Sequence, residues 1–100
     1  MNRLQEDLIN AVAQNKYDLV AQIIKERGVD PNFFNAEMGR ESPLYVACWN
    51  QNAKMVRLLV SLGAKIHKKA ISFFAWEELM RCKVSVTPVL RELYDAQQNK

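Results

Sequence analysis

The sequence is poor in the residues that build several familiar kinds of site. It has two cysteines, three glycines and one histidine in 100 residues. Two cysteines do not make a disulfide framework, and three separated glycines do not form a phosphate-binding loop. The excess of positive charge is only +3. That is well short of the basic footprint typical of a nucleic-acid-binding domain.

Long hydrophobic runs are also missing. No apolar run approaches the ~20 residues that a transmembrane helix needs, and the first residues lack the apolar core of a secretory signal. Length and composition predict a single soluble domain over residues 1–100. Cys48 and Cys82 lie within apolar helical patterns, which favours buried free thiols and a reducing, cytoplasmic location.

Glycines and prolines divide the chain into short helical segments. Hydrophobic periodicity predicts six helices, at about residues 4–14, 18–27, 42–50, 53–62, 72–83 and 87–98. Ser42–Pro43 and Thr87–Pro88 each resemble a hydroxyl cap followed by proline at the first helical position. No segment shows the alternation of a strand, so we expect an all-α fold of three helix pairs.

The helix pairs repeat. At an offset of 36 residues the apolar positions of the first two pairs coincide, as Leu8 does with Leu44. The third pair matches less well, with Leu79 at 35 residues after Leu44. These offsets predict units at about 4–32, 42–67 and 70–98, with a long finger loop at 33–41. The second helix of the middle unit is apolar nearly all round, whereas the outer units keep polar faces. We therefore expect a whole array of cap, centre and cap.

Three motifs resemble those of a known family. Ser42-Pro43-Leu44-Tyr45-Val46-Ala47 is similar to the T-P-L-H-x-A signature of ankyrin repeats. Gly28-Val29-Asp30-Pro31-Asn32 resembles the turn between repeats, and Gly63-Ala64 the end of a second helix. The chain thus resembles an ankyrin-repeat protein, well over residues 4–67 and weakly over 70–98. The resemblance implies a solenoid of three stacked antiparallel helix pairs. Tyr45 departs from the pattern, because it replaces the family's histidine.

The resemblance also implies a function. Ankyrin-like arrays bind another protein on a concave face formed by the finger loops and the first helices, which here predicts a non-catalytic interaction module. The expected binding residues are Phe33, Phe34, Met38, Arg40, Glu41, Val46, Trp49 and Asn50. Asn10, Ala13 and Gln14 are the corresponding positions of the first unit. Two alternatives stay open: Trp49 as a core residue against Trp76, and Phe33–Phe34 tucked under the first turn. Trp76 itself is expected in the core.

The residues that could support catalysis or metal binding have no suitable partners nearby in the sequence. His67 lies among lysines, with no Cys or carboxylate at metal-ligand spacing. Glu77 and Glu78 are adjacent, so on a helix they point about 100° apart. We expect no enzyme activity, cofactor, metal, small-molecule substrate or membrane contact. Two alternative functions remain: an inhibitor or immunity-type protein that blocks one enzyme, and a nucleic-acid contact through Lys65, Lys68 and Lys69.

Overall fold

The computed structural model describes residues 3–33, 42–81 and 86–99. These residues form six helices and no strand, which confirms the expected all-α fold. The helices are α1 (Arg3–Ala13), α2 (Tyr17–Glu26), α3 (Pro43–Trp49), α4 (Ala53–Ser61), α5 (Lys68–Arg81) and α6 (Thr87–Gln98).

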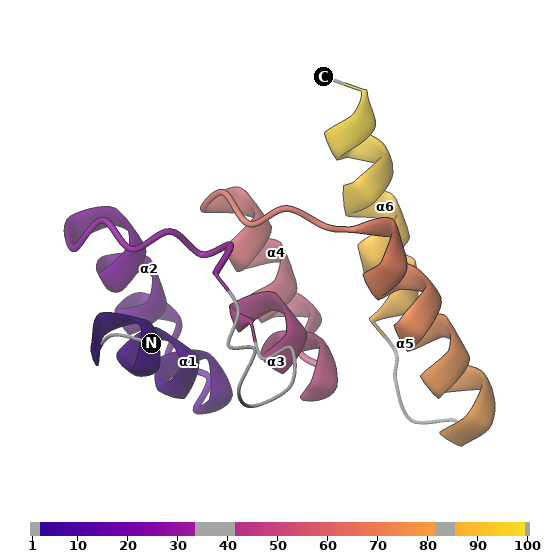
Figure 1. Ribbon diagram of the computed structural model, residues 1–100, viewed down its shortest axis with the longest axis horizontal. Helices are drawn as coiled ribbons and strands as arrows, with labels where there is room; N and C mark the ends of the chain where they lie inside the picture. The colour runs from indigo at the N-terminus through magenta and orange to yellow at the C-terminus, as the bar shows by residue number, and fades with distance from the viewer. Residues whose placement is uncertain (1–2, 34–41, 82–85, 100) are drawn as a thin grey trace.

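The six helices form three antiparallel pairs that stand side by side (Figure 1). Within the pairs, α1 packs on α2, α3 on α4, and α5 on α6. Between the pairs, α1 packs on α3, α2 on α4, and α4 on α6. The first helices and the second helices therefore form separate rows, as in the stack that the repeat predicted. The molecule measures 36 × 32 × 22 Å.

The middle pair begins where its capping residues require. The Ser42 Oγ accepts a hydrogen bond from the Tyr45 amide (3.1 Å), and Pro43 follows at the first helical position. Proline there loses no helical hydrogen bond. Asn52 caps α4 in the same way, because its Oδ1 accepts from the Met55 amide (3.1 Å). The expected cap at Thr87 is wrong, since Val86 is the N-cap of α6 and Thr87 is already helical.

The backbone repeats at the same offset as the sequence. Asn15 and Gln51, 36 residues apart, end α1 and α3 with positive φ values of 59° and 57°. At each position the next amide reaches back five residues: Lys16 donates to the Ala11 carbonyl (2.9 Å), and Asn52 to the Ala47 carbonyl (3.0 Å). Both helices thus end in a Schellman motif. Gly28 (φ 70°) and Gly63 (φ 108°) take the left-handed conformation after the second helices.

One continuous core runs through all three pairs. Leu8 and Val12 of α1, Val20 of α2, and Met55 and Leu59 of α4 are fully buried in it. Stacking the pairs buries apolar faces that a single pair leaves in water.

The third pair departs from the sequence expectation. Helix α5 starts at Lys68, four residues before the expected start near Ser72, and its expected end near Lys83 lies outside the described residues. Phe74 is its fully buried large side chain. Trp76, expected in the core, is 53% exposed, and Leu79, aligned with the buried Leu44, is 77% exposed. Both core assignments are wrong because the apolar residues of α5 surround the helix and leave its inner side ambiguous.

Candidate functional site

The end of α3 presents a large aromatic side chain to solvent. Trp49 is 47% exposed, and its ring stacks on Tyr45 one turn earlier, with centroids 6.1 Å apart and planes 11° apart. The alternative of a core position for Trp49 is therefore wrong. Asn50 is exposed beside it and Val46 is half-buried. Three of the expected binding residues thus lie together on one short helix, with the indole held by a neighbouring ring.

Tyr45 also joins the middle pair to the last pair. Its ring centroid lies 5.9 Å from that of Phe73 and 5.5 Å from that of Phe74, and these two rings meet edge to face at 5.0 Å. Such aromatic pairs add stabilisation beyond their buried area. At the position of the family's histidine this chain therefore packs a ring against α5. This contact could not be predicted from the sequence, because the apolar residues of α5 do not show which of its sides faces inward.

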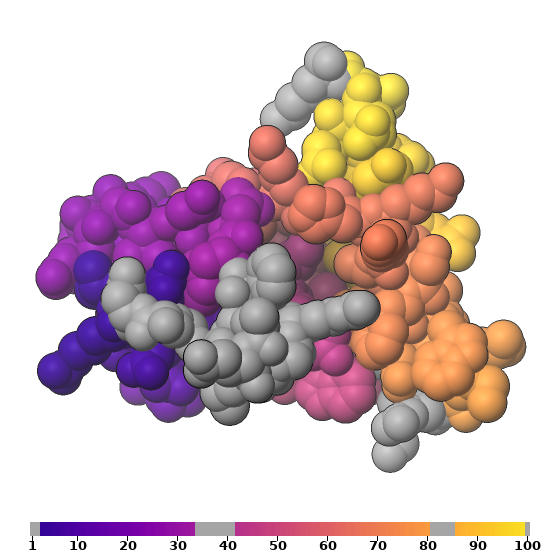
Figure 2. Space-filling model, viewed as in Figure 1, coloured from indigo at the N-terminus to yellow at the C-terminus, as the bar shows by residue number. Residues whose placement is uncertain are grey.

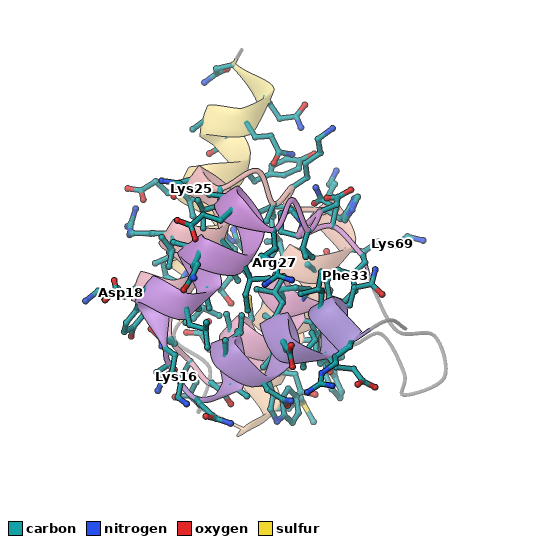
Figure 3. All side chains as sticks on the ribbon, turned by 90° about the vertical axis from the view of Figure 1, so that its left-hand side faces the viewer. Lys16, Asp18, Lys25, Arg27, Phe33 and Lys69 are labelled. Carbon is teal, nitrogen blue, oxygen red and sulfur yellow. The ribbon has the colours of Figure 1, made fainter. Side chains whose placement is uncertain are left out.

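The other residues expected on the binding face do not belong to α3. Phe33 is half-buried against the core and lies above α1 in the view of Figure 3. Phe34, Met38, Arg40 and Glu41 lie outside the described residues. Asn10, Ala13 and Gln14 are exposed on α1. Asn10 and Gln14 line a shallow groove of about 270 Å³ between α1 and α2, together with Asp7, Leu19 and Arg27.

A second group of exposed apolar residues lies on α5. Trp76, Leu79 and Met80 are 53%, 77% and 63% exposed. None of the three was among the binding residues expected from the sequence. Their spacing of three and four residues places them on one side of a helix. The ends of α3 and α5 both lie along the lower edge of the molecule (Figures 1 and 2).

Polar side chains tie together the turns that follow α2 and α4, on the upper side of the molecule in Figure 1. The Asn32 Nδ2 donates to the Gly63 carbonyl (3.0 Å), and the Lys65 amide donates to the Asn32 Oδ1 (2.8 Å). The Gln97 side chain pairs with the backbone of Ile66 through two hydrogen bonds of 3.0 Å each. These amides fix one turn against the next and the end of α6 against the second turn. In the sequence they are ordinary polar residues, and their role depends on contacts more than 30 positions away.

Cys48 is a buried titratable residue of α3. Burial raises the pKa of the Cys48 thiol to about 12, so this cysteine is a protonated core residue. His67, Lys65, Lys68 and Lys69 are exposed. Within the described ranges, no three His, Cys, Asp or Glu side chains are placed to hold a metal ion. No described helix is long and apolar enough to span a membrane.

The comparison with known families addresses the middle pair. The family model of the ankyrin repeat matches residues 40–71. The chain contains an ankyrin repeat. This ankyrin repeat comprises α3, α4 and the turn into α5, so it includes Trp49 and Asn50. Ankyrin repeats generally act as protein–protein interaction modules and are typically non-catalytic. No solved structure matches the chain.

Proposed function

We propose that this ankyrin-repeat chain is a non-catalytic module that binds a partner protein on the face formed by its first helices. The observation that supports this most directly is the half-exposed Trp49 at the end of α3. Its indole is stacked on Tyr45, so binding would cost little of its conformational freedom. A preordered aromatic side chain is favourable for this reason, and tryptophan is among the residue types enriched at interface hot spots.

The proposed binding set is Phe33, Phe34, Met38, Arg40, Glu41, Val46, Trp49 and Asn50. Val46 and Trp49 belong to α3 of the matched repeat, and Asn50 is the C-cap of that helix. The half-buried Phe33 follows Asn32, whose side chain is hydrogen-bonded to the next turn. Ankyrin repeats generally act as protein–protein interaction modules. The buried free thiol of Cys48 fits the cytoplasmic location that we propose for the protein.

The test is a binding experiment with a matched control. Tagged wild-type chain, Trp49→Ala and Leu19→Ala are used to capture partners from a lysate of the source cell, and captured proteins are identified by mass spectrometry. Leu19 is also a large, exposed apolar residue, at 39%, but it lies on α2. The affinity of the purified partner for each chain is then measured by calorimetry.

We expect Trp49→Ala to weaken binding about 30-fold, as for a hot-spot residue contributing at least ~2 kcal/mol. Leu19→Ala should leave the dissociation constant within about twofold of the wild-type value. Both variants should unfold near the wild-type temperature, because both side chains are substantially exposed. Equal binding by wild type and a folded Trp49→Ala chain would contradict the proposal.

A further inference from the structure

Helix α5 has an apolar outer side in its second half. Trp76, Leu79 and Met80 are exposed, whereas Phe74 and Glu77 on the inner side are buried. Single exposed apolar residues are ordinary on protein surfaces. Three large ones on one side of one helix form a contiguous apolar patch, which marks an interaction site. The aromatic contacts with Tyr45 lie one turn earlier, at Phe73 and Phe74, and leave this side open.

The outer side of α5 continues the surface around Trp49. Trp49 follows Tyr45 by four residues and Trp76 follows Phe73 by three, and Tyr45 and Phe73 are in contact. Both tryptophans therefore lie about one turn beyond the same contact, toward ends of α3 and α5 that share one edge of the molecule (Figure 1). We call Trp49, Trp76, Leu79 and Met80 the tryptophan edge. They are four of the five large apolar residues that are exposed in the described part of the chain.

The first turn of α5 is basic. Lys68 and Lys69 are exposed there. Steps of three, four and three residues lead from Lys69 through Ser72 and Trp76 to Leu79, so all four lie on one side of the helix. Along the helix axis, Lys69 is about 10 Å from Trp76 and about 16 Å from Met80. The Lys69 side chain extends into solvent on the opposite side of the molecule from Lys16 and Lys25 of α2 (Figure 3).

We propose that the tryptophan edge binds an amphipathic helix of the partner protein, whose acidic residues, about two turns from its apolar ones, face Lys68 and Lys69. This inference rests on the proposed function and adds the chemistry of the partner. A linear apolar stripe of several turns matches the anchor pattern of a bound helix. The lysines at one end of the stripe select carboxylates and fix the direction in which the helix lies.

The charges on α5 argue against a second copy of the chain in this place. Two α5 helices packed in parallel would put Lys69 against Lys69. Packed antiparallel, they would put Lys69 near Met80 of the other copy. Neither arrangement supplies a carboxylate from α5, because Glu77 is buried and Glu78 is half-buried. A partner segment that carries its own acidic residues satisfies both parts of the surface.

Peptide selection on the full-length chain tests the proposal. Random peptides of about 16 residues, four to five helical turns, are displayed on phage and selected on the wild-type protein. The dissociation constants of enriched synthetic peptides are measured by fluorescence polarisation. The variants are Leu79→Ser/Met80→Ser and Lys68→Glu/Lys69→Glu. The control Lys16→Glu/Lys25→Glu changes the net charge equally on α2 (Figure 3).

We expect the enriched peptides to carry acidic residues six to eight positions from an apolar cluster, as two turns of helix require. Both test variants should weaken their binding about tenfold or more, and the control by less than about twofold. The chain has two tryptophans, so its spectrum has two indole N–H signals. Both should shift when peptide is added to the ¹⁵N-labelled wild-type protein. This readout decides the question even if a variant fails to fold.

Several results would overturn the inference. These are enrichment without acidic residues, equal binding to the Lys68→Glu/Lys69→Glu chain, and indole signals that do not move. Binding to phosphatidylserine vesicles that is lost in the same variants, while no peptide binding depends on them, would assign the surface to lipid instead. A cellular partner lost with Trp49→Ala but kept by Leu79→Ser/Met80→Ser would leave the proposed function standing and contradict this inference alone.

Discussion

Cys48 keeps its proton at neutral pH because its thiol lies in the core of the ankyrin repeat. It is 1% exposed, and burial raises its pKa from 9.0 to about 12. A thiolate at this position would lack both water and a neighbouring cation. The residue therefore acts as a small apolar side chain beside Ala47, as the sequence analysis expected. Cys82 lies outside the described residues.

The raised pKa predicts a loss of stability at high pH. The unfolded chain releases the Cys48 proton near pH 9 and the folded chain only near pH 12. The contribution of the neutral thiol is therefore complete below pH 9 and falls as pH rises from 9 to 12. The difference in free energy of unfolding between wild type and Cys48→Ala, measured in urea, should shrink over this range. Parallel curves for the two proteins would contradict the prediction.

Gln51 is a strained residue whose replacement should stabilise the protein. Its φ of 57° is left-handed, a conformation that costs a non-glycine residue roughly 1–2 kcal/mol. Gln51→Gly should raise the free energy of unfolding by about 0.5–1 kcal/mol after the greater entropy of unfolded glycine is included. Gln22→Gly, at an exposed site within α2, should lower it by a similar amount. Urea titrations that show a loss for both would refute the strain at Gln51.

Exposure could be predicted from the sequence for some residues and not for others. Trp49 and Asn50 were expected on the binding face, with a core position for Trp49 left open, and both are exposed to solvent. They follow a repeat motif that fixes which side of α3 faces inward. Trp76 was expected in the core and Leu79 was aligned with the buried Leu44, but α5 is apolar on most of its circumference and both residues are exposed. Hydrophobic periodicity identifies an inner side only when the other side is polar. Only the packing of Phe73 and Phe74 on Tyr45 decides the rotation of α5.

At the scale of the helix, Asn52 begins α4 and connects it to the preceding pair. Its Oδ1 accepts from the Met55 amide, and its Nδ2 donates to the Asn15 Oδ1 (2.7 Å) and the Tyr17 hydroxyl (3.0 Å). Lys54, two residues on, places its ammonium 4.5 Å from the centre of the Tyr17 ring. The turn of the second pair is thereby held against the turn of the first.

Two substitutions of Asn52 should separate the cap from the cross-links. Asn52→Ala removes the cap and the side-chain hydrogen bonds to Asn15 and Tyr17, and should destabilise the protein by about 1–3 kcal/mol. Asn52→Asp keeps the acceptor for the Met55 amide and loses only the two donors, so its cost should be smaller. Asn50→Ala, at an exposed site without a side-chain cap role, is the control. If Asn52→Asp costs as much as Asn52→Ala in chemical denaturation, the cap contributes nothing.

Helix boundaries followed from sequence where the capping residues were distinctive. Ser42–Pro43 located the start of α3 to the residue. Helix α5 has no such signal, and it begins directly after the turn at Ala64–His67. Hydrophobic periodicity led instead to an expected start four residues later. Thr87–Pro88 suggested a cap, but the helix starts one residue earlier than a Thr87 cap would require, because Val86 takes that position.

At the scale of the whole molecule, polar contacts link the last pair to the rest of the stack. Arg57 of α4 and Glu92 of α6 form an ion pair of 2.6 Å, but both side chains are more than half exposed. Exposed pairs contribute at most about 1 kcal/mol. The two hydrogen bonds between the Gln97 side chain and the Ile66 backbone are half-buried and should matter more.

Gln97→Ala should therefore loosen the attachment of α6. Two net hydrogen bonds are worth about 1–3 kcal/mol, so the protection of the Ile66 amide against hydrogen exchange should fall roughly 5- to 100-fold. Gln98→Ala, at the adjacent exposed position, should leave it unchanged. The readout is native-state exchange followed by NMR. Unaltered exchange at Ile66 in Gln97→Ala would show that the apolar packing of the last pair holds it in place without Gln97.

The stacking of the helix pairs could be predicted from the sequence, but the side-chain hydrogen bonds between neighbouring pairs could not. An offset of 36 residues was enough to propose stacked pairs, because repeats that cannot bury their apolar faces alone must pack on one another. The contacts of Asn32, Asn52 and Gln97 join residues 31 to 37 positions apart. Such contacts depend on the exact rise from pair to pair, which no local pattern encodes.

Because of where the two tryptophans lie, the tryptophan fluorescence of the molecule reports on two of its three helix pairs. Trp49 and Trp76 belong to the second and third pairs, and the first pair contains no tryptophan. In a linear stack an end unit can open while its neighbours stay closed. If α1 and α2 detach first, circular dichroism will fall while the indole emission stays constant. If α5 and α6 detach first, both signals will change together. The separation of the two melting curves thus reveals the end from which the protein unfolds.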